Sequence, residues 1–239
     1  MTPARTLDST LAGCAIAIVE ECSSGDLDAM LCSRGATVRR VLVPRPDAHE
    51  LGSAAMHAGR GEADAVILAS ASVAGSWVEA AERTDALESI RRRAGSGRLL
   101  LVAMGAGVAD RLRDADLRTV VSDPARPTSP ADLVIEHFGS GGALSQRTDA
   151  GLVEVRSGGV VVDGVFVPLS RSAVALIDAL ASAGGRVISR EELGGALPGP
   201  QRTPHAVEAA VARLRDALGQ RALVHTVVKR GYRLAVSEI

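Results

Sequence analysis

Short apolar runs alternate with amphipathic segments along the first 140 residues of the chain. The runs are rich in Val, Ile, Leu and Ala, and each is only as long as an ordinary strand. Such runs are typical of strands that are covered on both faces of a parallel sheet. We therefore expect five strands, at residues 12–19, 37–43, 63–69, 99–104 and 119–122.

The segments between these runs carry apolar residues at helical spacing, as in Leu27, Met30 and Leu31. Ser129 followed by Pro130 is a typical helix start. Helices are expected at 26–34, 50–59, 72–83, 108–114 and 129–138. The alternation of strands and helices predicts an α/β domain, a five-stranded parallel sheet with helices on both faces.

The last third of the chain has a different order of elements. Asp163 and Gly164, between β-branched residues, indicate a hairpin turn. Ser170 and Ser189 are placed as helix N-caps, and Glu192 completes a capping box with Ser189. Strands are expected at 152–156, 160–163 and 165–169, followed by one helix after Ser170 and a short one after Ser189.

A longer helix and a second hairpin follow. Pro204 stands at the first helical position, and Gly219 follows the last one. The helix 204–218 has one apolar stripe for burial, made by Val207, Val211, Leu214 and Leu218. Strands at 223–227 and 232–236 then form a hairpin whose tip is 228–231.

Charge separates the two parts of a chain whose formal net charge is −1. Residues 151–239 carry eleven basic and eight acidic residues, whereas residues 1–150 carry 16 basic and 20 acidic ones. A basic end attached to a mildly acidic domain is typical of a nucleic-acid-binding module. The segment rich in Gly and Ser between them predicts a linker at 141–150, joining domains at 1–140 and 151–239.

The composition argues against several classes of protein. With 46% hydrophobic and 23% charged residues the chain is globular, and no apolar run is long enough for a membrane span. No export signal is expected, and three cysteines without metal-ligand spacing suit a reducing cytoplasm. The sequence contains no Ser/His/Asp grouping, HExxH motif or P-loop, so we expect no catalytic residue, metal or cofactor.

In open parallel sheets, ligands bind beyond the carboxyl ends of the strands. Two serines, Ser70 and Ser72, follow the strand 63–69 at this edge. They are candidate anion ligands and, equally, ordinary caps at the end of the strand. Trp77 is expected in the core rather than at a ligand. The candidate ligand-binding residues of the first domain are Glu20, Glu21, Ser70, Ser72, Gly105 and Gly107.

The first domain resembles the response-regulator receiver in outline. Glu20 and Glu21 follow the first strand, where a receiver has acidic residues. Ala69 and Ser70 stand where a receiver has its phosphoacceptor Asp, and the first 150 residues contain no Lys to pair with the phosphate. An atypical response regulator without the phosphoacceptor therefore remains only as an alternative.

The first domain also resembles the second half of uroporphyrinogen-III synthase, in segments 35–38, 43–45, 63–70, 104–109 and 124–128. The resemblance implies a flavodoxin-like fold. Pro44 and Val108 stand where the family has Tyr and Thr hydroxyls that face the tetrapyrrole, and the chain has length for one of the two lobes. We expect a catalytically inactive domain for sensing or dimerisation. Because each lobe of the family borrows elements from both halves, a homodimer is expected, with element swapping as one form.

The last domain resembles the OmpR-type winged helix-turn-helix DNA-binding domain, in segments 189–193, 207–208, 213–215, 226–227 and 231–234. The resemblance implies that helix 204–218 enters the major groove of double-stranded DNA and that the hairpin tip reaches phosphates or the minor groove. Arg215 and Arg233 are either DNA ligands or partners within the domain. The residues expected to contact DNA are Arg202, His205, Ala209, Ala212, Arg213, Lys229, Arg230 and Tyr232.

Together these features predict a cytoplasmic, sequence-specific transcription regulator. Few side chains on the outward face of helix 204–218 can form hydrogen bonds with bases. We therefore expect modest sequence specificity, which dimerisation or a partner regulator would raise. The same pairing of domains occurs in regulators of high-GC bacteria tied to nitrogen assimilation, which implies such a role. The alternative is a tetrapyrrole-related enzyme or ligand-binding protein whose basic end is incidental.

Overall fold

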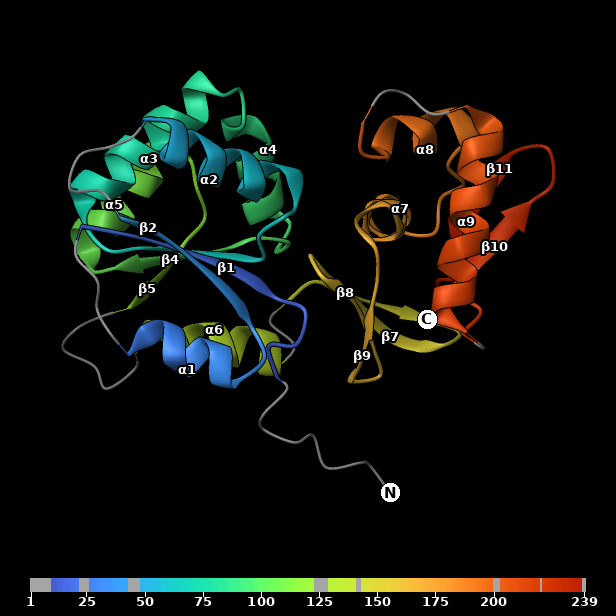
Figure 1. Cartoon of the computed structure of the whole chain (residues 1–239), viewed down its shortest axis with the longest axis horizontal. Coiled ribbons are helices and arrows are strands. Elements are labelled where there is room, and N and C mark those ends of the chain that lie inside the picture. Colours follow the sequence, from blue (N-terminus) through green and yellow to red (C-terminus); the bar gives the residue numbers. More distant parts are fainter. Residues whose placement is uncertain are drawn as a thin grey trace. The chain divides into compact units, whose positions relative to one another are not determined.

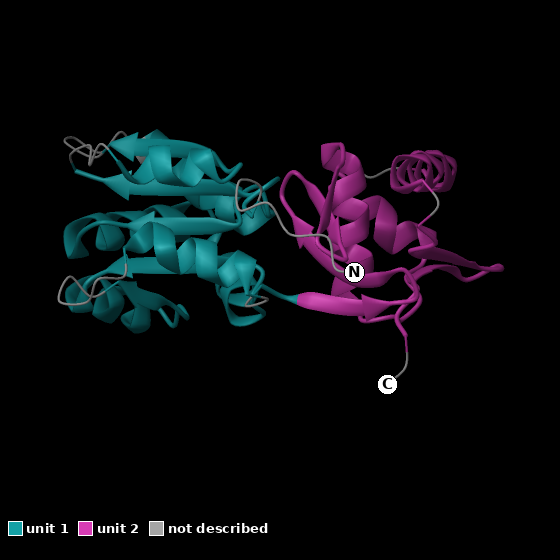
Figure 2. Ribbon diagram, turned by 90° about the horizontal axis from the view of Figure 1, so that it is seen from below, with its two compact units in different colours: residues 1–144 teal, residues 145–239 magenta. Residues whose placement is uncertain are grey.

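The computed structural model describes residues 10–21, 26–42, 48–122, 129–140, 143–199, 203–219 and 221–237. The chain divides into two compact units, which Figure 2 draws in different colours. Unit 1 is Met1–Leu144 and unit 2 is Ser145–Ile239. Each unit has its own buried hydrophobic core, so each is described by itself.

A parallel sheet of five strands forms the centre of unit 1, in the order β2-β1-β3-β4-β5. The parallel register pairs Ile16 of the first strand with Ala65, and Ala65 in turn with Leu100. The five expected strands are thus confirmed. They are β1 (Ala15–Glu20), β2 (Thr37–Leu42), β3 (Ala65–Leu68), β4 (Leu100–Met104) and β5 (Val120–Ser122).

Helices cover both faces of this sheet (Figure 1). One face carries α1 (Leu27–Ser33) and α6 (Pro130–Gly139). The other face carries α2 (Ala48–Arg60), α3 (Ala71–Arg83), α4 (Leu87–Gly95) and α5 (Ala106–Asp114). Successive side chains of a strand point to opposite faces, so Ile16 and Ile18 pack under α1 and α6 while Ala17 and Val19 pack under the other four helices. This is the expected flavodoxin-like α/β fold.

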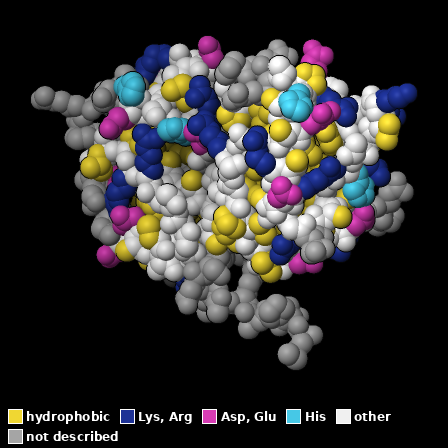
Figure 3. Space-filling model, turned by 45° about the vertical axis from the view of Figure 1, so that its right-hand side comes forward, with side chains coloured by type: hydrophobic (Ala, Val, Ile, Leu, Met, Phe, Trp, Pro, Cys, Tyr) yellow, Lys and Arg dark blue, Asp and Glu magenta, His cyan; other side chains and the backbone are white. Residues whose placement is uncertain are grey.

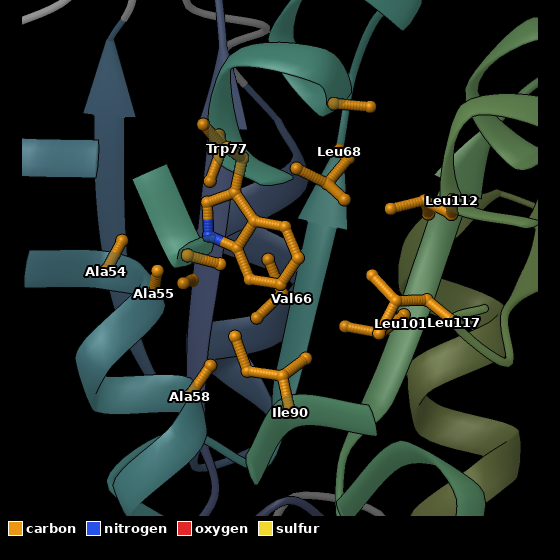
Figure 4. Close-up of a cluster of buried hydrophobic side chains, with 14 of the residues drawn as sticks. Ala54, Ala55, Ala58, Val66, Leu68, Trp77, Ile90, Leu101, Leu112 and Leu117 are labelled. Carbon is orange, nitrogen blue, oxygen red and sulfur yellow. The ribbon is translucent and has the colours of Figure 1, made fainter. Parts of the chain in front are cut away.

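Trp77 lies in the core of unit 1, as expected. Its side chain is fully buried against alanines of α2 and against β3, with Ile90 of α4 close by (Figure 4). The α2 residues beside the ring are small: Ala54, Ala55 and Ala58. Their small side chains let the indole ring of α3 pack closely against α2.

Unit 2 opens with a four-stranded antiparallel sheet in the order β6-β7-β8-β9. Three helices and a two-stranded hairpin follow it. The strands of the sheet are β6 (Ser145–Thr148), β7 (Gly151–Arg156), β8 (Gly159–Val162) and β9 (Val165–Pro168). The other elements are α7 (Arg171–Ser182), α8 (Arg190–Ala196), α9 (Pro204–Leu218), β10 (Val224–Val227) and β11 (Gly231–Leu234).

Two local signals in unit 2 have the expected geometry. Asp163 and Gly164 have φ angles of 48° and 79°, as the central residues of a type I′ hairpin turn require. The capping box at the start of α8 is complete: the Ser189 N–H donates to Glu192 Oε2 at 2.8 Å, and the Glu192 N–H donates to Ser189 Oγ at 3.1 Å.

Part of the segment expected as a linker is a strand. β6 pairs with β7 in an antiparallel ladder, and Thr148 at its end is buried. The Thr148 hydroxyl donates to the Gly151 carbonyl at 2.7 Å, which fixes the turn between the two strands. The strand is held chiefly by main-chain hydrogen bonds, so its polar residues carry no hydrophobic pattern.

Within the described ranges, no helix combines the length and the apolar character needed to cross a membrane. The same ranges contain no group of three or more His, Cys, Asp or Glu side chains that could hold a metal ion.

Candidate nucleic-acid interface

Helix α9 is fixed to the core of unit 2 by one apolar stripe. Val207, Val211, Leu214 and Leu218 are each at most 1% exposed. The Thr203 hydroxyl oxygen accepts a hydrogen bond from the Ala206 N–H at 3.4 Å and thereby caps the helix. With this stripe buried, the opposite face of the helix is turned to solvent.

The outward face of α9 carries the residues that were expected there. A helix presents positions three and four apart on one side, which gives a stripe long enough to lie in a DNA groove. Its exposed residues are His205, Glu208, Ala209, Ala212, Arg213 and Asp216. Arg202, which was also expected to contact DNA, lies outside the described residues.

Glu208 is held by an arginine from the neighbouring helix. Arg190, at the first position of α8, donates from Nε to Glu208 Oε1 at 2.8 Å. The same guanidinium lies 5.4 Å from the ring centroid of Tyr232. Arg190 therefore joins α8, α9 and β11 and partly neutralises the carboxylate on the outward face.

Arg215 is a partner within the domain. Its guanidinium donates to the Val224 carbonyl at 2.8 Å and to Thr226 Oγ1 at 2.9 Å, so it ties the end of α9 to β10. It also lies 5.8 Å from the Tyr232 ring. Of the two interpretations of Arg215 left open by the sequence, these contacts favour the intradomain role.

Tyr232 was expected among the residues that contact DNA, and the structure packs its ring within unit 2. Its side chain is only 5% exposed, in the core of unit 2, with the guanidinium groups of Arg190 and Arg215 over its ring. An aromatic ring between two helices gains more from burial than from contact with a groove, because it removes a large apolar area from water. Tyr232 thus packs beneath the candidate nucleic-acid interface and supports Arg190 and Arg215.

The tip of the β10–β11 hairpin is a tight turn of exposed residues. The Arg230 N–H donates to the Val227 carbonyl at 3.0 Å, and Lys229 at the third position of the turn has a φ of 61°. Val228 is 78% exposed. We call Val228, Lys229 and Arg230 the wing tip; all three side chains point away from the core.

Gly231 fixes the base of the wing. The main chain of Ile188 exchanges hydrogen bonds of 2.8 and 2.9 Å with Tyr232, which brings the two segments into contact. A Cβ at position 231 would lie 1.9 Å from the Ile188 carbonyl oxygen, and the φ of Gly231 is 138°. Only glycine satisfies both constraints, so the contact between Gly231 and Ile188 fixes the direction in which the β10–β11 hairpin projects.

A groove of about 870 Å³ lies between the end of α9 and the hairpin. Its lining includes four basic residues, Arg215, Arg221, His225 and Arg233. The Arg221 guanidinium donates to the Leu218 carbonyl at 3.3 Å. Basic residues thus extend from the wing tip along the groove to the end of α9.

Two classes of cation contribute to this surface. Arg190 and Arg215 are engaged within unit 2, as described above. In contrast, no described residue forms a hydrogen bond or ion pair with the side chains of Arg213, Lys229, Arg230 or Arg233. A cation without an internal partner is free to neutralise a phosphate or to donate to a base edge. We call these four residues the unpaired cations.

The candidate ligand site of unit 1 is only partly open. Glu20 does not meet the expectation: it is 2% exposed and pairs with Arg40, which also pairs with Asp28 at 2.8 Å. This hydrogen bond from Arg40 lowers the pKa of the Asp28 carboxyl. Arg40 thus pairs with one carboxylate at the end of β1 and with another in the first turn of α1.

The remaining residues of that edge lie at the first turns of two helices. The Ser70 hydroxyl donates to Glu21 Oε1 at 3.0 Å and accepts from the Val73 N–H at 3.2 Å, so Ser70 is the cap of α3. Ser72 is exposed. Gly105 precedes α5 with a φ of 104°, and a Cβ on Gly107 would be 3.9 Å from the Cβ of Ala71.

Charges of both signs are mixed on the face of the molecule drawn in Figure 3. On the face drawn in Figure 3, Lys and Arg side chains are interspersed with Asp and Glu, in keeping with the net charge of −1. Any attraction to a polyanion therefore depends on the local arrangement of the unpaired cations rather than on the field of the whole protein.

Comparison with known families identifies the second unit. Residues 164–234 match the family described as "Transcriptional regulatory protein, C terminal". No curated protein matches the chain.

Several solved structures are similar to parts of the chain. The DNA-binding domain of CpxR from E. coli is 28% identical, covering 38% of this chain and 96% of that one, with a TM-score of 0.33. The Klebsiella pneumoniae RstA DNA-binding domain, solved in complex with the RstA box, is 24% identical over the same shares, with a TM-score of 0.33. Uroporphyrinogen III synthase from Thermus thermophilus is 21% identical, covering 55% of this chain and 52% of that one, with a TM-score of 0.34.

The family match coincides with the elements that present the unpaired cations. It runs from the turn before β9 to the end of β11 and includes α7, α8 and α9. The chain carries an OmpR-type winged-helix DNA-binding domain of the transcriptional regulators, following a flavodoxin-like α/β domain.

Proposed function

We propose that this chain is a sequence-specific transcription regulator that reads double-stranded DNA with the outward face of α9 and grips it with the wing tip. The observation that carries the proposal is the set of unpaired cations, which project from α9 and from the wing while the neighbouring Arg190 and Arg215 are engaged internally. The match of residues 164–234 to the family of transcriptional regulatory proteins supports the choice of DNA as partner.

The chemistry of α9 predicts how it reads sequence. Arg213 is the principal side chain able to donate to a guanine edge, and His205 adds a second polar group at the start of the helix. Ala209 and Ala212 offer methyl groups that suit the methyl of thymine. Few bases are then read per site, so we propose that a homodimer or a partner regulator supplies the remaining specificity.

A mobility-shift series with the full chain and duplex fragments from its own promoter region tests the proposal. We expect Arg213→Ala to weaken specific binding by about 1–3 kcal/mol, if it contacts a base. Lys229→Ala is expected to weaken binding to all duplexes alike and to lower the salt slope by about 1. Arg113→Ala, which removes an exposed arginine from unit 1, is the matched control. If the wild-type chain binds no duplex even at low ionic strength, the proposal is wrong.

For unit 1 we propose a role in sensing or dimerisation, without catalysis. Val108 supports the absence of synthase chemistry, because it is 3% exposed inside the core and offers no hydroxyl to a substrate. Formation of a cyclised product from hydroxymethylbilane would contradict this proposal. The edge with Glu21, Ser70, Ser72, Gly105 and Gly107 remains the candidate sensing site.

The five-stranded sheet of unit 1 is complete within one chain, so a dimer does not need exchanged elements to close it. We propose a homodimer, and light scattering that finds only monomer at high micromolar concentration would contradict it. The proposed connection with nitrogen assimilation rests on the sequence resemblance alone. Transcript levels in a deletion strain under rich and poor nitrogen supply test it.

A further inference from the structure

Unit 1 contains a cavity at the edge of the sheet opposite to the candidate sensing site. It has a volume of about 290 Å³ and lies where β4 and β5 begin, between the ends of α4 and α6. This is close to the lower end of the range for small-molecule sites, roughly 300–1,000 Å³. The carboxyl ends of the strands, where ligands of this fold are expected, are at the other edge.

One part of the cavity wall is apolar. Ala94, Leu99 and Leu101 line it and are each at most 3% exposed. These three side chains belong to the core on one side of the sheet, and Leu100, which also lines the cavity, belongs to the core on the other side. An apolar lining of this kind favours the hydrocarbon part of a ligand.

Two basic side chains converge on the cavity. Arg118 lines it, and no described residue pairs with its guanidinium. His137, on α6, also lines it, and its Nε2 atom is buried without a hydrogen-bond partner among the described residues. A buried ring nitrogen without a partner destabilises the folded chain, and a hydrogen bond to a ligand oxygen would remove that cost.

The surroundings of the cavity are electropositive. Burial and the charge of Arg118 lower the pKa of His137. Burial and the nearby Arg93 lower the pKa of Arg98, between two cavity residues, to about 10. No carboxylate is among the described residues that line the cavity. An anion in the cavity would be attracted by the charge of Arg118.

We propose that this cavity binds a small organic carboxylate with an apolar body, whose charge pairs with Arg118 and whose oxygen accepts a hydrogen bond from His137 Nε2. The apolar body contacts Leu99, Leu101 and Ala94. The site is separate from DNA binding, so the proposal does not depend on the proposed function.

Calorimetric titration of the full chain tests the site with four probes: benzoate, hexanoate, benzamide and inorganic phosphate. We expect the two carboxylates to bind and the uncharged benzamide to bind at least tenfold more weakly, because it lacks the charge that Arg118 recognises. Absence of carboxylate binding at millimolar concentration, or equal binding of benzamide, overturns the proposal. Binding of phosphate but not of carboxylates overturns the assignment of an organic ligand.

Variants locate the binding within the chain. Arg118→Gln, at an exposed position that does not endanger the fold, is expected to weaken benzoate binding at least tenfold. Arg111→Gln, an exposed arginine of α5, is the matched control and is expected to bind as the wild type does. Nuclear magnetic resonance adds a second readout, since benzoate should raise the pKa of the His137 imidazole. Unchanged binding by Arg118→Gln, or an unchanged His137 pKa with benzoate bound, contradicts the proposal.

Discussion

Arg190 and Glu208 form an ion pair of 2.8 Å that joins the start of α8 to the outward face of α9. Glu208 is an exposed carboxylate on the surface that we propose to face DNA, and phosphates would repel it. The guanidinium of Arg190 reduces that repulsion and at the same time packs on Tyr232. The ion pair thus holds α8 against α9 and also reduces the negative charge of the proposed DNA-binding surface.

Changing either partner should shift DNA affinity in opposite directions. Glu208→Gln is expected to strengthen binding to all duplexes, whereas Arg190→Gln is expected to weaken it because it leaves the carboxylate uncompensated. Arg186→Gln is the matched control, since its contact with Glu192 is long, at 3.8 Å, and lies away from α9. Mobility shifts at two salt concentrations measure the changes, and equal affinities for both variants would contradict the role of the pair.

Gly231 should be intolerant of any side chain. Gly231→Ala places a methyl against the Ile188 carbonyl, so we expect it to lower the free energy of unfolding of unit 2 by about 1–3 kcal/mol or more. Gly195→Ala is the control, because a Cβ there meets nothing within 4 Å and alanine favours the helix by about 1 kcal/mol. Thermal unfolding followed by circular dichroism separates the two, and a neutral Gly231→Ala would contradict the close approach.

The left-handed conformation of Lys229 separates the stability of the wing from its charge. Lys229→Gly removes the strain of a positive φ and is expected to raise the free energy of unfolding by up to about 1 kcal/mol. The same change removes a cation, so the salt slope of DNA binding should fall by about 1. Arg230→Gly, at a residue that lacks a positive φ, should lower the slope without the gain in stability. A variant at 229 that is less stable than the wild type would contradict the assignment of strain.

His137 should make the stability of unit 1 depend on pH. Burial and Arg118 hold the pKa of the folded imidazole below the ordinary 6.5, so the unfolded chain takes up the proton first as the pH falls. The free energy of unfolding is therefore expected to fall between pH 6.5 and the lower pKa of the folded state. Melting curves across this range should show a smaller fall for His137→Phe than for His49→Gln, and equal curves would contradict the prediction.

Much of the fold follows from hydrophobic pattern and turn chemistry. The strands of unit 1 are continuous apolar runs, and Asp163, Gly164 and the Ser189 capping box specify their turns and helix start directly. Helix α4 was not expected, because only Leu87, Ile90 and Ala94 of its nine residues reach the core. Strand β6 was missed for the related reason that its residues are polar and its pairing is made by the main chain.

The candidate site shows where sequence reasoning stops. The outward residues of α9 follow from helical spacing once the apolar stripe is known. The engagement of Arg215 with Val224 and of Glu20 with Arg40 depends on contacts between residues distant in the sequence, which no local pattern reveals. The same holds for Arg118 and His137, which only the folded chain brings to one cavity.

The distribution of aromatic residues gives each unit its own optical reporter. Trp77, the one tryptophan of the chain, is buried in unit 1, and Tyr232, the one tyrosine, is buried in unit 2. Indole emission therefore follows the melting of the first unit without labelling, while the tyrosine absorbance follows the second. Whether the halves of this protein unfold together or one after the other can be observed in a single sample of unmodified material.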